Sequence, residues 1–386
     1  MARRVALLGA TGSIGRQTLE VLRGHREEFT LVSVAAARRL DELADIAREF
    51  GVTHIGVARE EDRAIVAGKL AGRAEVVAGP AGLAQLAREA DIVVNAVVGF
   101  AGLPVTLAAL AAGKRLALAN KESFIAAAPL VERVRATPGA EVVPLDSEHC
   151  AIHQCLAGSS APGHPDVRAL WLTASGGPFR GWTRDRLAEA TRQDALQHPT
   201  WSMGPKITVD SSTLMNKGFE ILEASALFGI EVDRVKVVVH PQSIVHSMVE
   251  YVDGSLLAQL ARPDMRLPIA YGLGYPERLA DGWGALDLTE RLALSFEPPD
   301  LEAFPAIPLA YAAARAGGAA AAWLSGANEV AVDAFLAGRL RWSEIVPVVA
   351  SVMDEFVDGP MREVADVVAH DAAARDRAAR AITVHS

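Results

Sequence analysis

Short apolar runs alternate with amphipathic stretches along the first 150 residues of the chain. The runs are rich in β-branched residues, as buried strands are, and the stretches between them repeat apolar positions at helical spacing. Strands that alternate with helices predict a parallel sheet covered on both faces, with ligands at the carboxyl ends of the strands. We expect strands in seven runs: RVALLG, TLVSVAA, THIGVA, AEVVAG, DIVVNAV, RLALAN and EVVPL.

The pattern changes after about residue 150. Strand-like runs (ALWLTASG, KITVDS, VKVVVHP, SIVHSMVEYV and SLLAQLA) follow one another, and Asp253-Gly254 is a hairpin signal, so a mixed or antiparallel sheet is expected. A proline-rich stretch, SFEPPDLEAFPAIP, then resembles an extended linker. Alanine-rich segments with helical spacing over 311–336, 342–356 and 362–382 predict a small helical bundle.

These patterns predict an α/β protein in which a Rossmann-type doubly wound parallel sheet precedes a central α/β domain with a mixed sheet and a C-terminal helical bundle. We place a nucleotide-binding domain at 1–150, a catalytic domain at 151–285, a linker at 286–310 and the helical domain at 311–386.

Composition narrows the functional classes. The 386 residues carry a net charge of −9, which disfavours nucleic acid and anionic membranes as general partners. The apolar run at Val5–Leu8 is too short for a signal peptide, and glycines and a proline divide the most apolar window, so no membrane segment is expected. Two cysteines, Cys150 and Cys155, support neither a disulfide framework nor a cysteine-based zinc site, which favours the cytoplasm.

A glycine-rich turn, GATGSIG at 9–15, directly follows the first expected strand and precedes a helix. Its glycines would let the backbone approach a pyrophosphate at the helix N-terminus, although the spacing is G-x-x-G-x-x-G and a plain strand-helix connection is the alternative. The second expected strand ends in Arg38 and Arg39, where an NAD site usually has an acidic residue. Two guanidinium groups suit a 2′-phosphate, so we predict NADPH; the alternative is an exposed helix start.

Asp146 and Glu148 follow the seventh expected strand, in PLDSEH. If the chain stays extended there, both side chains project to one side while Ser147 points away. Paired oxygen ligands suit Mg²⁺ or Mn²⁺; ion pairs with arginines across a domain boundary are the alternative. A later expected helix carries Glu220 and Glu223 three residues apart, so that one of them could complete the ligand set.

Polar residues of three further segments suit an anionic ligand. Ser211, Asn216 and Lys217 precede the two glutamates near the N-terminus of their helix, where phosphate or sugar hydroxyls could bind. Ser175 in TASGGPF offers a hydroxyl beside flexible glycines. The segment 197–206, QHPTWSMGPK, could close over a ligand, or could be a surface loop anchored by its tryptophan. His240 and His246 are expected to be hydrogen-bonded structural residues.

With these residues assembled, the chain resembles the 1-deoxy-D-xylulose-5-phosphate reductoisomerase family over essentially its full length. The resemblance rests on six blocks in order: GATGSIG, LANKES, PLDSEHCAIHQ, TASGGPF, HPTWSMGPKITVDSSTLMNKGFEILEA and VVVHPQSIVHSMV. It implies an NADPH-dependent oxidoreductase with an isomerase step, which rearranges and reduces 1-deoxy-D-xylulose 5-phosphate to 2-C-methyl-D-erythritol 4-phosphate in non-mevalonate isoprenoid biosynthesis. It also implies Mg²⁺ or Mn²⁺ and a homodimer.

The resemblance assigns roles residue by residue. The implied metal ligands are Asp146, Glu148 and Glu220, and Glu148, Lys121 and His198 are the implied catalytic residues, with Glu148 our candidate for handling the proton. The implied substrate contacts are Lys121, Ser147, Glu148, Ser175, His198, Ser211, Asn216, Lys217 and Glu220. The implied NADPH contacts are Thr11, Gly12, Ser13, Ile14, Ala37, Arg38, Arg39, Asn120, Glu122 and Gly204.

One departure from the family pattern concerns the segment after the second strand. The family often has Gly-Lys-Asn where this chain has Ala37, Arg38 and Arg39, which keeps the positive charge but leaves the contact of Ala37 open. Two other functions stay open from the sequence: a related NADPH reductase of another phosphorylated aldehyde, and a non-catalytic nucleotide sensor. A sensor would be free to lose the three acidic metal ligands, all of which are present.

Overall fold

The computed structural model describes residues 2–157, 163–201 and 203–385. By its internal contacts the chain divides into two compact units. The first unit comprises 1–124, 130–150 and 264–284, and the second comprises 125–129, 151–263 and 285–386. The predicted domain bounds are drawn differently, since they assign 264–284 to the catalytic domain and separate the C-terminal helices from the central sheet; those bounds stay a prediction.

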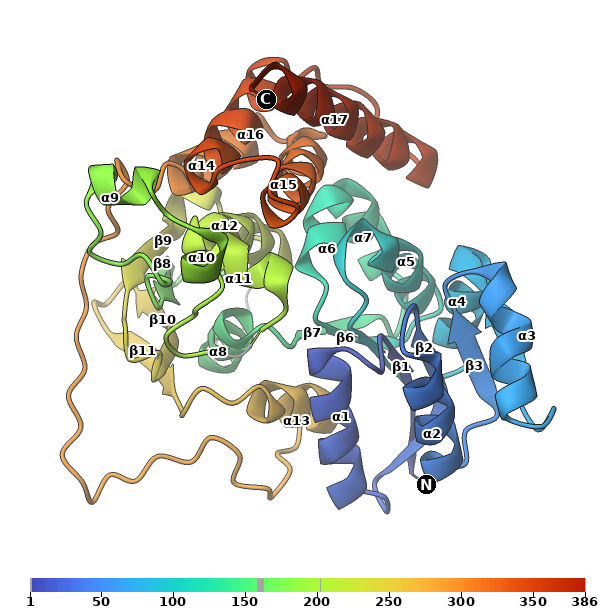
Figure 1. The fold of residues 1–386 in the computed structure, drawn as a ribbon. Coiled ribbons are helices and arrows are strands. Elements are labelled where there is room, and N and C mark those ends of the chain that lie inside the picture. The colour runs from blue at the N-terminus through green and yellow to red at the C-terminus, as the bar shows by residue number, and fades with distance from the viewer. Residues whose placement is uncertain (1, 158–162, 202, 386) are drawn as a thin grey trace. The chain divides into compact units, whose positions relative to one another are not determined.

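The first unit is built on a seven-stranded parallel sheet (Figure 1), in the order β4-β3-β2-β1-β5-β6-β7. Each of the seven predicted runs forms one of its strands, which confirms the Rossmann-type prediction. The strands are β1 (Arg3–Leu8), β2 (Phe29–Ala36), β3 (His54–Val57), β4 (Glu75–Ala78), β5 (Ile92–Asn95), β6 (Arg115–Leu118) and β7 (Glu141–Pro144).

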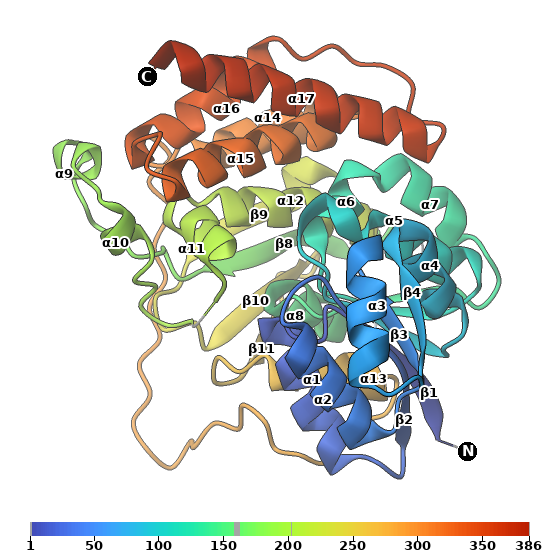
Figure 2. The same cartoon turned by 45° about the vertical axis from the view of Figure 1, so that its right-hand side comes forward.

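Helices cover both faces of this sheet (Figure 2). Right-handed crossovers place the helices after β1, β2 and β3 on one face. The helix after β4, which returns the chain to β5, packs with the helix after β5 on the other face. Because neither face meets water, consecutive strand residues such as Leu7 and Leu8 are both fully buried. The helices are α1 (Ser13–Gly24), α2 (Leu40–Phe50), α3 (Glu60–Lys69), α4 (Gly79–Arg88), α5 (Leu103–Ala111), α6 (Lys121–Ala126), α7 (Ala128–Arg135) and α13 (Arg266–Gly274).

Helix α13 belongs to the first unit although it lies far along the chain. It packs against α1, β6 and β7, and its Ile269, Ala270 and Leu273 join the apolar core of the sheet. This burial explains why residues 264–284 group with the N-terminal sheet.

The second unit contains a mixed four-stranded sheet in the order β11-β10-β8-β9. Its strands are β8 (Val167–Ala174), β9 (Val235–Val239), β10 (Val245–Tyr251) and β11 (Leu256–Leu260). Strands β8 and β9 are parallel, whereas β10 runs antiparallel to both β8 and β11. The hairpin predicted at Asp253-Gly254 is confirmed between β10 and β11.

One predicted strand of this unit is wrong. The run KITVDS lies in a helix, α11 (Pro205–Ser212), which begins after Gly204 with proline in its first turn. Packing against α12 (Met215–Phe228) and α15 (Ala320–Leu336) overrides the strand preference of its β-branched residues. The shorter helices of this region are α8 (Ser147–Cys155), which starts in the first unit, α9 (Arg184–Ala188) and α10 (Arg192–Ala195).

The C-terminal part is helical, as predicted, and comprises α14 (Ala306–Ala316), α15, α16 (Ile345–Asp354) and α17 (Val364–His385). The single helical segment predicted over 311–336 is wrong, because Gly317 and Gly318 adopt positive φ (66° and 51°) and separate α14 from α15. Residues 275–305, all of them described, form no regular helix or strand. Helix α14 begins inside the bounds 286–310 given for the linker, which stay a prediction. Among the described residues no helix is both long and apolar enough to span a membrane.

Candidate active site

The glycine-rich turn lies at the switch point of the parallel sheet, where β1 has β2 on one side and β5 on the other. Gly9 has φ +97°, and a Cβ there would lie 2.3 Å from the Ala96 carbonyl oxygen at the end of β5. A Cβ on Gly15 would lie 2.3 Å from the carbonyl oxygen of Gly9. Only glycine fits both positions, so the turn brings backbone amides close to the space where a pyrophosphate could bind.

The two predicted arginines lie beside this turn. The Arg39 guanidinium donates a hydrogen bond to the Thr11 carbonyl oxygen (2.8 Å), and the Thr11 hydroxyl donates to the Arg38 carbonyl oxygen (3.2 Å). Arg39 has the left-handed conformation (φ 56°) that non-glycine residues rarely adopt, and Ala37, Arg38 and Arg39 are all exposed. The predicted cofactor residues 11–14 and 37–39 therefore share one end of the sheet.

An acidic cluster lies at the carboxyl ends of the neighbouring strands β6 and β7. The Lys121 ammonium, at the start of α6, forms an ion pair with Asp146, and the His149 Nδ1 atom lies 3.8 Å from the same carboxylate. Lys121 is buried, and Asp146 is only 18% exposed. The sequence alone left open what offsets these carboxylates; within the first unit, Lys121 offsets Asp146.

The local backbone differs from the extended chain expected at this point. Helix α8 starts at Ser147, so Ser147 and Glu148 lie in its first turn, and the Ser147 hydroxyl donates to Glu148 Oε2 (2.5 Å) instead of pointing away. Oxygen atoms of Asp146 and Glu148 still lie within 4.8 Å of each other. Two hard ligands can therefore face one cation, for a different geometric reason from the one predicted.

Asn120 and Glu122 flank Lys121. The buried Asn120 side chain donates to the carbonyl oxygens of Val97 and Gly99 (2.7 Å for Gly99) and accepts from the Ser123 amide (3.0 Å). Asn120 thereby joins the loop after β5 to the start of α6 and fixes the position of Lys121.

In the second unit, α12 carries a buried charged group. Glu220 and Lys217 are 0% and 4% exposed; their side chains form an ion pair, and the Asn216 side-chain amide donates to Glu220 Oε1 (2.6 Å). Leu214 adopts a left-handed conformation (φ 60°) that ends α11 and starts α12. This break places Asn216 and Lys217 in the first turn of α12, where the helix dipole favours an anion. Glu223, one turn beyond Glu220, is also buried.

Ser175 and His198 form a hydrogen-bonded pair. His198 Nδ1 accepts hydrogen bonds from the Thr200 and Trp201 amides (3.2 and 2.8 Å), so in the neutral ring the proton is on Nε2 and is donated to Ser175 Oγ (3.0 Å). Ser175 Oγ also accepts from the Gly177 amide (3.1 Å). With its oxygen occupied as an acceptor, the hydroxyl proton of Ser175 can be donated to an anionic ligand. Ser202 of the predicted closing segment lies outside the described residues.

Other polar features of the molecule have structural roles. His240 Nε2 accepts from the Ile244 and Val245 amides and Nδ1 donates to the Ser295 carbonyl oxygen (2.8 Å), which confirms it as a structural residue. Burial raises the pKa of the Cys155 thiol to about 11, so it is protonated at neutral pH and is no nucleophile.

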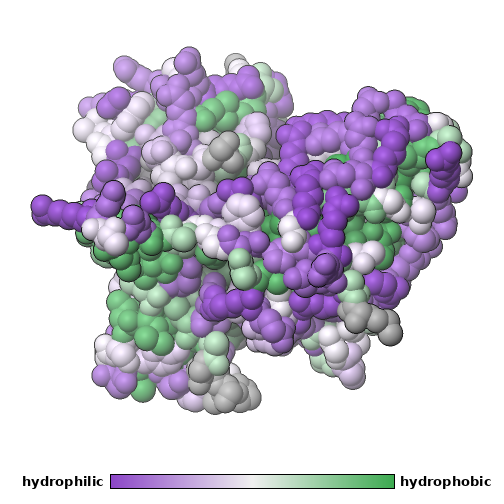
Figure 3. Space-filling view, turned by 90° about the horizontal axis from the view of Figure 1, so that it is seen from below, coloured by the Kyte–Doolittle hydropathy of each residue, from purple (hydrophilic) through white to green (hydrophobic). Residues whose placement is uncertain are grey.

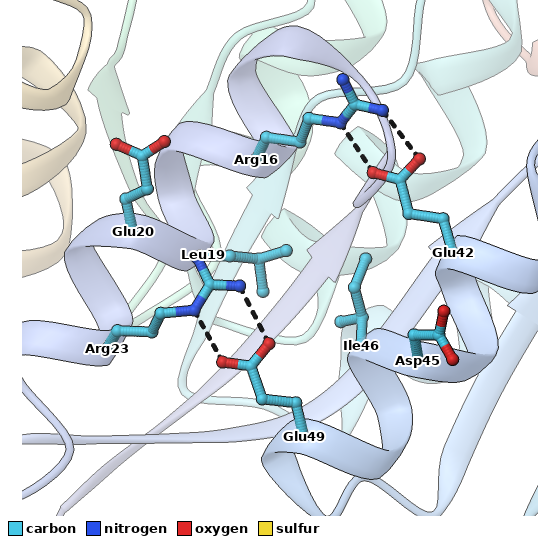
Figure 4. A pocket seen from close by; sticks show the side chains of 8 residues that line it. All are labelled: Arg16, Leu19, Glu20, Arg23, Glu42, Asp45, Ile46 and Glu49. Atoms are coloured by element: carbon cyan, nitrogen blue, oxygen red, sulfur yellow. Dashed lines mark hydrogen bonds and ion pairs between the residues drawn. The ribbon is translucent and has the colours of Figure 1, made fainter.

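A cavity of about 340 Å³ between α1 and α2 (Figure 4) contains none of the predicted site residues. Two arginine–glutamate pairs span it, Arg16 with Glu42 (2.6 Å) and Arg23 with Glu49 (2.6 Å). These pairs are largely exposed and contribute little to stability.

Sequence reasoning missed Asp210, Asn328 and Trp342, three residues that form polar contacts at α11. Buried Asp210 and Asn328 are hydrogen-bonded (2.8 Å), and the Trp342 indole donates to Ser212 Oγ (2.8 Å). Their partners are distant in sequence, so no local pattern indicates these contacts.

Known proteins resemble this chain over nearly its whole length. Family models match in order: 1-deoxy-D-xylulose 5-phosphate reductoisomerase at residues 5–128, its C-terminal domain at 142–228, and a DXP reductoisomerase C-terminal domain at 260–377. The reductoisomerase of Rhodococcus jostii (strain RHA1) is 51% identical over 380 residues, which cover 97% of this chain and 93% of the relative. That of Bordetella petrii is 50% identical over 389 residues, 97% of each chain.

Solved structures of reductoisomerases have the same fold as this chain. The Zymomonas mobilis enzyme in complex with NADPH is 40% identical and superposes with a TM-score of 0.91 over 99% of each chain. A DOX-P reductoisomerase in complex with NADPH, fosmidomycin and magnesium is 40% identical, with a TM-score of 0.95 over 99% of this chain and 98% of that one. Sequence and fold thus agree from end to end, and the chain belongs to the 1-deoxy-D-xylulose 5-phosphate reductoisomerase family.

Proposed function

We propose that this chain catalyses the NADPH- and divalent-metal-dependent rearrangement and reduction of 1-deoxy-D-xylulose 5-phosphate to 2-C-methyl-D-erythritol 4-phosphate, a step of non-mevalonate isoprenoid biosynthesis. The observation that carries the proposal is the full-length match to a reductoisomerase solved with NADPH, fosmidomycin and magnesium.

Asp146 and Glu148 of the first unit and Glu220 of the second are the proposed ligands of Mg²⁺ or Mn²⁺. Their oxygens are the hard donors that these ions prefer. Glu220 is fully buried and already paired with an ammonium group, so positive charge stabilises it. A bound ion supplies Lewis-acid polarisation of the substrate oxygens and a template that orients them.

The substrate residues have separate proposed tasks. Ser175, Ser211, Asn216 and Lys217 bind the phosphate and hydroxyl groups, and binding energy at the phosphate, remote from the reacting carbons, drives closure of segment 197–206. His198 orients the Ser175 hydroxyl through its Nε2 proton. Lys121 and Ser147 bind the substrate close to Glu148, which accepts and returns the proton of a substrate hydroxyl.

The proposed NADPH residues are those at the turn after β1, those at the end of β2, and Asn120, Glu122 and Gly204. Bound NADPH supplies the hydride that reduces the rearranged aldehyde. Exposed Arg38 and Arg39 favour the 2′-phosphate of NADPH over NADH. Among the described residues the thiols of Cys150 and Cys155 are not joined in a disulfide, which supports the proposed cytoplasmic location.

The proposed partner is a second copy of the chain, bound at β11. This strand is an outer strand of its sheet, and its side chains Leu256, Leu257 and Leu260 are 50%, 49% and 41% exposed. Hydrophobic side chains gather on the left of Figure 3, the side on which Figure 1 draws both this sheet and the extended segment between α13 and α14. An antiparallel edge strand can pair with its own copy about a two-fold axis, which covers the backbone groups and the leucines together.

Light scattering tests the dimer. The wild-type chain is expected at twice its monomer mass, and Leu257→Lys at the monomer mass, because a charge in the interface would be desolvated. Ile65→Lys is the control, since Ile65 is also 49% exposed but lies in the first unit. A monomeric wild type, or a dimer that survives Leu257→Lys, would overturn this interface.

NADPH oxidation with 1-deoxy-D-xylulose 5-phosphate, with and without Mg²⁺ or Mn²⁺, tests the reaction. We expect metal-dependent turnover that Asp146→Ala abolishes. The control Asp233→Ala should keep it, because Asp233 is an exposed acid paired with Arg315. Turnover that persists in a chelator would refute the metal's role. A wild-type chain that turns over only another phosphorylated aldehyde, or binds NADPH without any turnover, would favour the alternative functions.

A further inference from the structure

A buried polar group joins α11 to the C-terminal helices of the second unit. Asp210 of α11 is 1% exposed; its Oδ2 atom lies 2.8 Å from the Lys206 ammonium, and its Oδ1 atom accepts from the Asn328 amide of α15 (2.8 Å). Asn328 is fully buried. The Lys206 ammonium also lies over the Phe219 ring, 5.1 Å from its centroid.

Stability alone does not account for such a group. Desolvating a carboxylate and an ammonium costs about as much as their attraction returns, and apolar residues of similar volume often give an equally stable protein. The polar group fixes one arrangement, however, because hydrogen bonds are directional and apolar contacts are not.

The neighbours of Asp210 are a proposed substrate residue and one end of the segment proposed to close. Ser211 follows it directly, and Lys206 is the last residue of segment 197–206. A Cβ on Gly177 would lie 2.5 Å from the Ser211 carbonyl oxygen, so the loop that carries Ser175 is packed onto the same turn of α11. A displacement of α11 would therefore move both serines and one end of the closing segment.

A second contact from the C-terminal region fixes the same elements. The Trp342 indole donates to Ser212 Oγ (2.8 Å), and its ring packs edge-on against Phe179 at a centroid distance of 4.8 Å. Phe179 lies two residues after Gly177 of the Ser175 loop and is fully buried. The C-terminal region thus contacts both α11 and the residue Phe179 that follows the Ser175 loop.

We propose that Asp210 and Asn328 are positioning residues for the reaction: the pair holds α11 at α15 so that Ser211 and Lys206 stay in place while the substrate phosphate binds. This inference rests on the proposed function. It gives the C-terminal helical region, which contains none of the site residues predicted from the sequence, a part in substrate binding.

Exchange of the two side chains tests the pair. Asn328→Asp sets two buried carboxylates against each other and should lower kcat/KM for 1-deoxy-D-xylulose 5-phosphate about a hundredfold, mainly through KM. The double variant Asp210→Asn with Asn328→Asp restores one donor and one acceptor and should recover most of this loss. Asn328→Leu, which introduces no charge, serves if Asn328→Asp does not fold and should lower kcat/KM about tenfold.

Glu329→Gln is the matched control. Glu329 is adjacent to Asn328 on α15, but it pairs with Arg375 of α17 and not with α11. It should keep kcat/KM within about twofold of wild type, since it is coupled to no residue of the site. NADPH affinity, measured by fluorescence, should be unchanged in all variants that fold, because most proposed cofactor contacts lie in the first unit.

Hydrogen exchange of the α11 amides gives a readout independent of turnover. Exchange should be faster in Asn328→Asp and Asn328→Leu and unchanged in Glu329→Gln. Three results would overturn the inference. Both Asn328 variants could keep the wild-type kcat/KM, or Glu329→Gln could lose as much kcat/KM as they do. The third is hydrogen exchange of the α11 amides that stays at the wild-type rate in the Asn328 variants. If the wild type itself fails to convert the substrate, the proposed function fails, and exchange alone then decides whether the pair holds α11.

Discussion

Gly177→Ala should disturb the site far more than Gly181→Ala, although both glycines have left-handed backbone (φ +66° and +76°). A Cβ on Gly177 would lie 2.5 Å from the Ser211 carbonyl oxygen and 3.2 Å from its carbonyl carbon. A Cβ on Gly181 would have nothing within 4 Å. The two variants thus share the backbone strain, and only Gly177→Ala adds a clash with α11.

The magnitudes follow from these distances. Left-handed alanine costs about 1 kcal/mol in either variant. The contact at Gly177 is about 0.9 Å shorter than the 3.4 Å at which ordinary contact begins. The backbone fixes the position of a Cβ, and the Ser211 carbonyl is itself backbone, so neither group can rotate away. Overpacking of this kind costs about 1–3 kcal/mol more. A shift of about 1 Å in a substrate-binding residue can lower the rate about a hundredfold.

Steady-state kinetics and urea unfolding of both variants provide the assay. We expect kcat/KM for 1-deoxy-D-xylulose 5-phosphate to fall about a hundredfold in Gly177→Ala and about twofold or less in Gly181→Ala. The unfolding free energy should fall in both, with a difference of about 1–3 kcal/mol between them. Equal kcat/KM in the two variants would refute the claim that the Ser175 loop positions Ser211.

Three further predictions concern single charged contacts. Lys217→Met removes the ammonium beside buried Glu220 and should lower the unfolding free energy by about 3 kcal/mol in metal-free protein. Adding Glu220→Gln should restore most of this loss, because the buried charge is then gone. An unchanged urea midpoint in Lys217→Met would contradict the ion pair. Burial lowers the pKa of His25, but the hydrogen bonds and charges of Asp281 and Glu28 outweigh burial, so the net pKa is raised. Protonated His25 therefore stabilises the fold fully below about pH 6.5, and this stabilisation is lost as pH rises through the folded-state pKa. His25→Asn should therefore cost about 1 kcal/mol at about pH 5.5 and little at about pH 8.5, and a cost that grows with pH would show that the sign is wrong. Arg39→Glu should raise KM for NADPH about tenfold or more and leave KM for NADH nearly unchanged; a parallel rise for both would place Arg39 at the shared part of the cofactor.

The sequence by itself determined the parallel sheet, the glycine-rich turn and the acidic residues after β7. Each of these depends on a local pattern. Apolar runs buried on both faces need no information about their partners, and Gly9 is required by the backbone of its own turn together with a neighbouring strand that the fold class already implies. The family resemblance rested on six short sequence blocks in order along the chain, and recognising them requires no knowledge of how they pack.

Predictions from the sequence were wrong where tertiary packing overrode the local conformational preference of a segment. KITVDS has the β-branched residues of a strand, yet α12 and α15 hold it in a helix. The chain after Asp146 was expected to stay extended, but α8 begins at once, which turns Ser147 toward Glu148. The segment 264–284 reads as part of the second domain, and only the apolar face of α13 assigns it to the first sheet.

Only the tertiary structure decided which groups offset the buried charges. Asp146 faces Lys121 because β6 and β7 are adjacent, and Asp210 faces Asn328 across 118 residues of sequence. A carboxylate can be stabilised by any donor that folding brings within about 3 Å, and local periodicity carries no information about a donor that distant in the chain. The sequence therefore indicated the chemistry of the site, and the packing of the helices and strands determined which groups hold its residues in place.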